Sequence, residues 1–107
     1  MKIVCTNFRV FERNTLQGFT DLEIFDIGLT VRECTVHRKG DRWWIGLPGK
    51  PQIDKSGNVI RDPQSGKPAY VNILQFTGRS FADEFASDAI TAIRKAFPNA
   101  LSEGADA

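Results

Sequence analysis

Reactive and metal-binding side chains are scarce in this 107-residue chain, which contains two cysteines, one histidine and one methionine. The chain also lacks an apolar run that could cross a membrane and a charged-then-apolar leader before a cleavage site. His37 has no ligand partners at metal-site spacing, and no nucleophile has a base partner. We therefore expect a non-enzyme without cofactor or metal that begins at Met1, stays in the cytoplasm and does not bind membranes.

The two cysteines, Cys5 and Cys34, both fall inside predicted strands. Two thiols are too few for the disulfide framework of a small secreted domain, so we expect a reduced, buried pair. Cys34 is also close to His37 in sequence. Positions an odd number of residues apart on a strand face opposite sides, which argues against a catalytic Cys–His pair.

Two further motifs are incomplete. Residues 54–58 (Asp-Lys-Ser-Gly-Asn) lack the closing Glu and the ligand spacing of a calcium loop, and a turn is the better interpretation. Gly66 and Lys67 lack the preceding glycine and the following Ser or Thr of a phosphate-binding loop. Neither motif predicts a site.

The composition is that of an ordinary globular protein, with 41% hydrophobic and 25% charged residues. At this length we expect one domain over residues 1–100, followed by a flexible tail over residues 101–107. A core this small stabilises a chain only marginally, so a homodimer is expected.

Alternating and β-branched residues predict strands over residues 2–11, 19–25, 29–39, 42–47 and 69–76. Phe81, Phe85, Ala89, Ile93 and Phe97 recur every four residues and predict a C-terminal helix with this stripe in the core. The fold class is therefore α+β: an antiparallel sheet of about five strands with one C-terminal helix packed on it.

The predicted helix has end signals as well. Ser80 is a suitable N-cap with Asp83 at the third helical position, and Pro98 and Asn99 end the helix. Arg94 and Lys95 lie near the C-terminal end, where positive charge suits the helix dipole.

Gly40 and Asp41 predict a two-residue hairpin turn between the third and fourth strands. Counting outward from this turn gives an apolar face with the pairs Arg38–Trp43, Val36–Ile45 and Cys34–Leu47. The opposite face is basic and aromatic, with the pairs Lys39–Arg42, His37–Trp44 and Thr35–Gly46. By the same count Leu29 and Val31 would lie on the polar face, unless a bulge near Arg32 and Glu33 or a second subunit intervenes.

Residues 48–68 are rich in proline, glycine and serine, and they are too many for an ordinary structureless loop. We expect a functional loop or an inserted hairpin, with Val59 and Ile60 as a short strand.

Positive charge is concentrated in the middle of the chain. Residues 32–79 contain nine Lys or Arg and four Asp or Glu, a local charge of +5 in a chain of net charge +1. Such a region favours capture of an anionic partner.

Several residue patterns occur in the same order as in one known family: residues 6–10 (Thr-Asn-Phe-Arg-Val), Asn14 and Thr15, Asp26, residues 31–36 (Val-Arg-Glu-Cys-Thr-Val), and Leu47 and Pro48 with Lys50. Over residues 2–97 the chain resembles the SpoVG (stage V sporulation, septation protein G) family. The resemblance implies a small antiparallel sheet on a C-terminal helix, in a dimeric bacterial regulator that binds nucleic acid.

The chain departs from that family in two places. Its loop over residues 48–68 is longer, and only Arg79 fills the basic start of the closing helix, where Asp83 and Glu84 follow. The hairpin and the loop would therefore make more of the contact. The predicted nucleic-acid-binding residues are His37, Lys39, Arg42, Trp44, Lys50, Lys55, Arg61, Lys67 and Arg79.

Trp44 is the candidate platform for base stacking, and Trp43 on the apolar face is a candidate core residue. Alternatively, the dimer partner or the long loop covers Trp44, and His37 is either its cross-strand partner or a minor phosphate donor. The predicted function is a DNA- or RNA-binding regulator with weak sequence preference. The alternative is a protein–protein adaptor whose contact patch is Trp44, Leu29 and Val31, and an accessory protein of a mobile element fits both.

Overall fold

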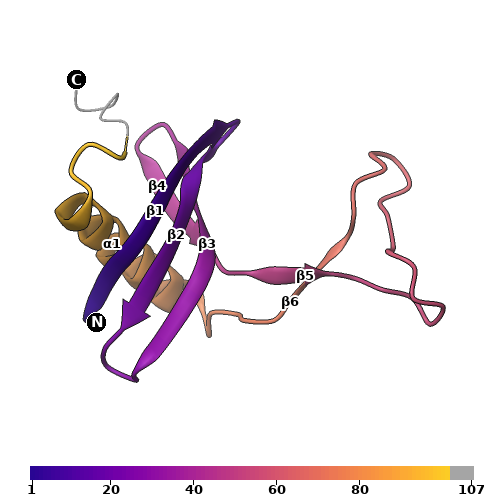
Figure 1. The fold of residues 1–107 in the computed structure, drawn as a ribbon, viewed down its shortest axis with the longest axis horizontal. Coiled ribbons are helices and arrows are strands. Elements are labelled where there is room, and N and C mark those ends of the chain that lie inside the picture. Colours follow the sequence, from indigo (N-terminus) through magenta and orange to yellow (C-terminus); the bar gives the residue numbers. More distant parts are fainter. Residues whose placement is uncertain (102–107) are drawn as a thin grey trace.

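A four-stranded antiparallel sheet in the order β1-β2-β3-β4 forms the body of the protein (Figure 1). Its strands are β1 (Ile3–Arg13), β2 (Leu16–Ile24), β3 (Leu29–Lys39) and β4 (Arg42–Gly46). A small second sheet pairs β5 (Gly49–Pro51) with β6 (Tyr70–Asn72), and the helix α1 spans Arg79–Ala96. The computed structural model describes residues 1–101. The α+β fold class is confirmed.

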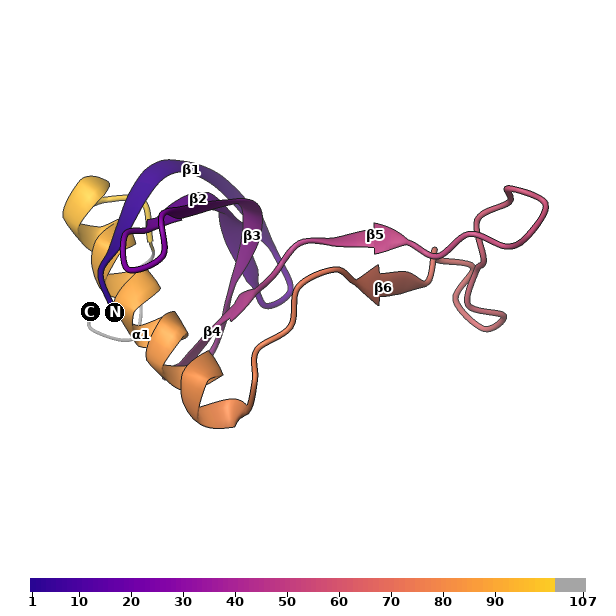
Figure 2. The same ribbon diagram turned by 90° about the horizontal axis from the view of Figure 1, so that it is seen from below.

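The helix α1 covers one face of the four-stranded sheet and leaves the other face open (Figure 2). The side chains buried in the core include Cys5, Leu22, Ile24, Val31, Cys34, Val36, Ile45, Phe85, Ala86, Ala89, Ile90, Ala92, Ile93 and Leu101. A large apolar side chain buried in this way stabilises the fold by about 1.5–3 kcal/mol. Trp43 packs against this core, as expected.

The β3–β4 register is confirmed pair by pair from Thr35 with Gly46 to Lys39 with Arg42. The bulge at Arg32 and Glu33 is confirmed as well. Thr20 pairs with Cys34 but Leu22 pairs with Val31, so two residues of β3 lie opposite Asp21 alone. Glu33 has a φ of 58° and donates its backbone N–H to Asp21 Oδ1 at 3.0 Å.

This extra residue reverses the alternation of side chains along β3. Val31 is consequently only 5% exposed and belongs to the core, which resolves the conflict between its expected face and its apolar character.

The fifth strand predicted over residues 69–76 is wrong in extent and place. Only Tyr70–Asn72 is a strand, and it pairs with β5 and not with the four-stranded sheet. Both strands belong to an arm, residues 49–74, which projects from the body beyond β4 (Figures 1 and 2). The expected inserted hairpin over residues 48–68 is therefore present as the first part of this arm.

The end of the arm divides into two tight turns. Ile53 pairs with Val59 around one turn, and Arg61 pairs with Pro68 around the other. Asp54 Oδ1 accepts the N–H of Ser56 and of Asn58 at 2.9 Å, so residues 54–58 form a turn, as expected. Asp62 plays the same part in the second turn, where its Oδ1 accepts the N–H of Gln64 at 2.7 Å.

The start of α1 differs from the prediction. The helix begins at Arg79 after Gly78, whose φ of 91° suits glycine, and Ser80 lies inside the first turn without capping it. Because the helix begins at Arg79, Asp83 is its fifth residue and not its third. Phe81 is 56% exposed and not a core residue, because it lies beside an open groove. The C-terminal end agrees, with Arg94 and Lys95 in the last turn.

The expected tail over residues 101–107 is wrong at its first residue, because Leu101 is only 3% exposed and packs in the core. Residues 102–107 of that tail lie outside the described residues. Within residues 1–101, no helix has both the length and the apolar character that crossing a membrane requires.

Cys5 and Cys34 are buried and form no disulfide, as expected. Burial raises the pKa of the Cys34 thiol to about 12. Cys5 Sγ lies 3.2 Å from Thr20 Oγ1, in a hydrogen bond inside the core.

Candidate functional site

The open face of the sheet presents a set of rings and guanidinium groups that comes from all four strands. Paired residues on adjacent strands share a face, and the pairing places Arg9, Phe19, Thr35 and Gly46 in one row. His37 and Trp44 form the next row. We define the outer-face cluster as Arg9, Phe11, Phe19, His37, Arg42 and Trp44.

Trp44 and His37 are the centre of the outer-face cluster. Their rings are stacked, with centroids 5.3 Å apart and planes inclined by 5°. The guanidinium carbon of Arg42 lies 5.3 Å from the Trp44 ring centroid. Trp44 is half-buried, so part of its indole surface is accessible. The expectation that His37 is the cross-strand partner of Trp44 is confirmed.

Two hydroxyl groups hold the imidazole of His37 in this stacked position. His37 Nδ1 lies 3.0 Å from Thr15 Oγ1, and His37 Nε2 lies 3.0 Å from Thr35 Oγ1. Burial lowers the pKa of His37, which favours the neutral ring at pH 7. His37 is therefore placed to orient Trp44, and it is a poorer candidate for a cationic phosphate contact.

Gly46 keeps the sheet surface clear beside this pair. A side chain at Gly46 would collide with Thr35 Oγ1, the same oxygen that contacts His37 Nε2. Glycine at this position thus keeps Thr35, His37 and Trp44 in place on one face.

A second aromatic pair lies on β1 and β2, and the sequence analysis missed it. The guanidinium carbon of Arg9 lies 4.5 Å from the Phe19 ring centroid, and the Phe11 ring is 6.0 Å from that of Phe19. Arg9 Nη2 also lies 3.6 Å from Glu33 Oε2, in an ion pair whose side chains are largely exposed. In the sequence, the alternation of Arg9 and Phe11 along β1 was the available signal. Counting from the turn at Asn14, whose φ is 56°, would not have paired Arg9 with Phe19, because the β1–β2 register shifts between Val10 and Arg13.

The predicted binding residues do not form one surface. His37, Lys39, Arg42 and Trp44 belong to the β3–β4 hairpin, as expected. Four others lie on the arm, beyond the opposite end of β4 from the turn at Gly40 (Figure 1), and are exposed: Lys50, Lys55, Arg61 and Lys67. Arg79 is the first residue of α1, and its Nε lies 3.9 Å from Asp83 Oδ2.

The contact patch of Trp44, Leu29 and Val31 that the adaptor hypothesis predicts is wrong, because the three residues do not lie on one surface. The bulge at Glu33 buries Val31 in the core, and Leu29 lines a groove on the helix side of the sheet. Trp44 points to the other side. These three side chains therefore cannot meet one partner together.

Among the residues that the structure describes, no three His, Cys, Asp or Glu side chains gather as metal ligands. Comparison of the chain with protein families, with curated proteins and with solved structures finds no match. The resemblance to the SpoVG family stays a prediction.

Proposed function

We propose that this protein binds single-stranded DNA or RNA on the outer face of its sheet, with weak sequence preference. The observation that supports the proposal is the stacked pair of Trp44 and His37 on a sheet face that α1 leaves open. Every base has a flat π-face, so exposed rings on a sheet bind single strands with little dependence on sequence. A duplex hides its bases from such a platform.

Charge around the rings favours an anionic ligand. Lys39 and Arg42 lie opposite each other at the end of the β3–β4 hairpin, and Arg9 lies over Phe19 on the same face. Three phosphate contacts on a single strand give a slope of log affinity against log salt of about −2. Between 50 and 200 mM salt the affinity should then fall about twentyfold. The acidic Glu33 beside Arg9 limits the electrostatic part of binding.

The proposed action is occupancy: the protein covers a stretch of nucleic acid and changes the access of other factors, without a catalytic step. A cytoplasmic regulatory role of this kind, in septation or sporulation, is what the resemblance to the SpoVG family implies. The arm cations Lys50, Lys55, Arg61 and Lys67 are exposed but lie away from the rings, so they are secondary candidates here.

The test is a fluorescence anisotropy titration of labelled single-stranded and double-stranded oligonucleotides, DNA and RNA, at two salt concentrations. We expect tighter binding of the single strands, with the salt dependence given above. Phe11→Ala should weaken the single-strand complex by about 1–3 kcal/mol, the contribution of one stacked base.

Phe25→Ala is the matched control. Phe25 is 51% exposed, close to the 45% of Phe11, but it lies in the turn after β2 and outside the outer-face cluster. Equal losses from both substitutions, or no binding to any oligonucleotide at low salt, would contradict the proposal. In the second case a protein partner on the outer face would be the hypothesis to test next, without the contribution of Leu29 and Val31 that the adaptor hypothesis assumed.

A further inference from the structure

An apolar groove opens between α1 and the sheet, on the opposite side from the outer-face cluster. It has a volume of about 380 Å³, and small-molecule sites commonly have volumes of about 300–1,000 Å³. The bulge at Glu33 forms part of the groove, because it turns Val31 to the helix side of the sheet. Leu29 and Leu74 at its edge are exposed, so a small molecule can enter.

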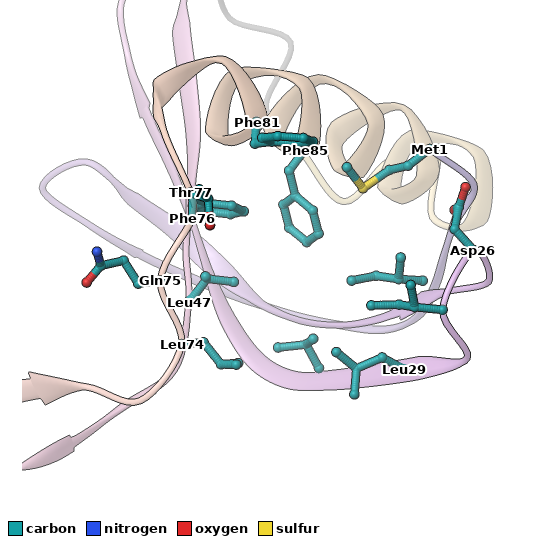
Figure 3. A pocket seen from close by; sticks show the side chains of 13 residues that line it. Met1, Asp26, Leu29, Leu47, Leu74, Gln75, Phe76, Thr77, Phe81 and Phe85 are labelled. Carbon is teal, nitrogen blue, oxygen red and sulfur yellow. The ribbon is translucent and has the colours of Figure 1, made fainter.

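Aromatic rings line one part of the groove. Figure 3 shows Phe81 and Phe85 reaching this space from α1, with Phe76 and Leu47 beside it. The rings of Phe76 and Phe85 pack together, with centroids 5.1 Å apart and planes inclined by 54°. Phe81 is 56% exposed, so much of its ring is accessible from the groove. A flat ring of a ligand can pack on such rings in offset or edge-to-face contact.

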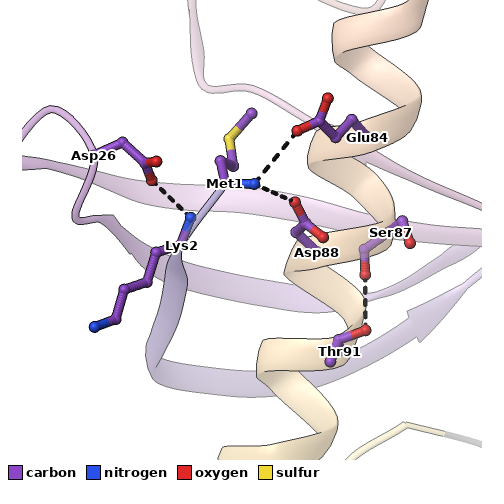
Figure 4. Close-up of polar contacts among 7 residues, drawn as sticks. All are labelled: Met1, Lys2, Asp26, Glu84, Ser87, Asp88 and Thr91. Atoms are coloured by element: carbon purple, nitrogen blue, oxygen red, sulfur yellow. Dashed lines mark hydrogen bonds and ion pairs between the residues drawn. The ribbon is translucent and has the colours of Figure 1, made fainter.

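The far side of the groove from Phe76 is acidic. Among the described residues that line the groove, Asp26 is the one with an ionisable side chain. Its Oδ1 accepts the backbone N–H of Lys2 at 2.7 Å (Figure 4), and its second oxygen, Oδ2, takes no part in that bond. A carboxylate at the end of an apolar groove favours a ligand with a positively charged group at one end.

The charges around Asp26 do not reverse this preference. The amino group of Met1 lies 3.3 Å from Glu84 Oε2 and 3.0 Å from Asp88 Oδ2, so two carboxylates surround it (Figure 4). The ammonium group of Lys2 lies over the Phe25 ring, 5.3 Å from its centroid. Three carboxylates and two cations leave this end of the groove with a net negative charge.

We propose that the groove binds a small aromatic amine, a flat apolar ring that carries a positively charged amino group. The ring packs on Phe76 and Phe81, and the amino group pairs with Asp26. A ligand of the same shape with a carboxylate would be repelled at the acidic end. This inference does not rest on the proposed function, because the groove and the outer-face cluster lie on opposite faces of the sheet.

The first test is an NMR titration of protein whose methionine is labelled with carbon-13 in the methyl group. Met1 is the single methionine of the chain and lines the groove, so its methyl signal reports binding there. The probes are naphthylethylamine and naphthylacetate, which share a ring and have opposite charges at pH 7. We expect the amine to shift the Met1 signal through the ring current of naphthalene. It should bind about threefold to fivefold more tightly than the acid.

The second test separates the charge of the groove from its shape. Asp26→Asn keeps the oxygen that accepts the Lys2 N–H but removes the charge, and it should weaken binding of the amine about threefold to fivefold. Asp41→Asn is the matched control, since Asp41 is an exposed aspartate in the β3–β4 turn and does not line the groove. It should leave the affinity for both probes unchanged.

The third test removes a ring from each face of the sheet. Phe81→Ala should weaken binding of both probes about tenfold, because it removes an aromatic contact. Phe11→Ala, which removes a 45% exposed ring from the outer-face cluster, should leave their binding unchanged. Circular dichroism checks that each variant is folded, and the comparison of the two probes on wild type needs no variant.

Three outcomes would overturn the proposal. One is a Met1 signal that does not move at millimolar naphthylethylamine. Another is equal affinity of wild type for the two probes, since the groove would then not select by charge. The third is a Met1 signal that moves with protein concentration in the absence of a probe, together with a higher mass by sedimentation equilibrium, because a second copy would then occupy the groove.

Discussion

Ile93 and Ile53 are the same residue type in two regions of this molecule that are built differently. Ile93 on α1 is fully buried among side chains from the sheet, whereas Ile53 on the arm is 56% exposed. In the body, packing of α1 on β1 to β4 fixes both the backbone and the side chains. In the arm, hydrogen bonds and Asx turns fix the backbone while the apolar side chains lack a core. An ordered backbone in one region of this molecule therefore does not require an apolar core in that region.

The largest expected difference in the free energy of unfolding is that between alanine substitutions at these two isoleucines. Ile93→Ala should lower the free energy of unfolding by about 2–5 kcal/mol, because it creates a cavity in the core. Ile53→Ala should change the free energy of unfolding of the monomer by about 0.5 kcal/mol or less. Urea denaturation at a protein concentration where the chain is monomeric measures both values. Equal losses would mean that the arm is packed against the body.

Within the body, the lack of a side chain at Gly46 keeps the outer face in order. Gly46→Ala should destabilise the fold by about 1–3 kcal/mol, since the added methyl group collides with Thr35 Oγ1. Removing that oxygen should relieve the collision. The double variant Thr35→Ala with Gly46→Ala should therefore be more stable than Gly46→Ala alone in thermal unfolding, and a double variant less stable than Gly46→Ala would refute this explanation.

A smaller effect is expected from pH. Burial lowers the pKa of His37 below its ordinary value of 6.5, so the unfolded chain binds this proton more readily than the folded chain does. The contribution of His37 to stability is then complete above pH 6.5 and is lost as the pH falls through the folded-state pKa. His37 is the single histidine of the chain, so an NMR titration reports it without ambiguity. A midpoint above 6.5 would contradict the structure.

The smallest effect concerns the thiols. Because burial raises the pKa of Cys34 to about 12 and also raises that of Cys5, neither thiol should react with a disulfide reagent in the native protein at pH 8. Both should react at once in urea. Fast reaction without denaturant would show that the core opens more readily than the packing of α1 implies.

The sequence was sufficient for the parts of the fold that local chemistry determines. Gly40 and Asp41 set the β3–β4 register, and the mismatch of Val31 pointed to the bulge at Glu33. Arg9, Phe11 and Phe19 escaped notice because the β1–β2 register shifts between Val10 and Arg13, which a simple count from the turn does not predict. The separation of the arm from the sheet depends on long-range packing, and the alternation within residues 69–76 contains no sign of it.

The proposed binding of single strands on the outer face depends on the ring of Trp44, so substitution of Trp44 is the decisive experiment. Trp44→Ala should weaken binding of a labelled single-stranded oligonucleotide by about 1–3 kcal/mol while the protein stays folded. Tyr70→Ala, which removes a more exposed ring on the arm, should leave the affinity of the body for that oligonucleotide unchanged when measured on monomeric protein. An unchanged affinity for Trp44→Ala, at a salt concentration where wild type binds, would contradict nucleic-acid binding on the outer face.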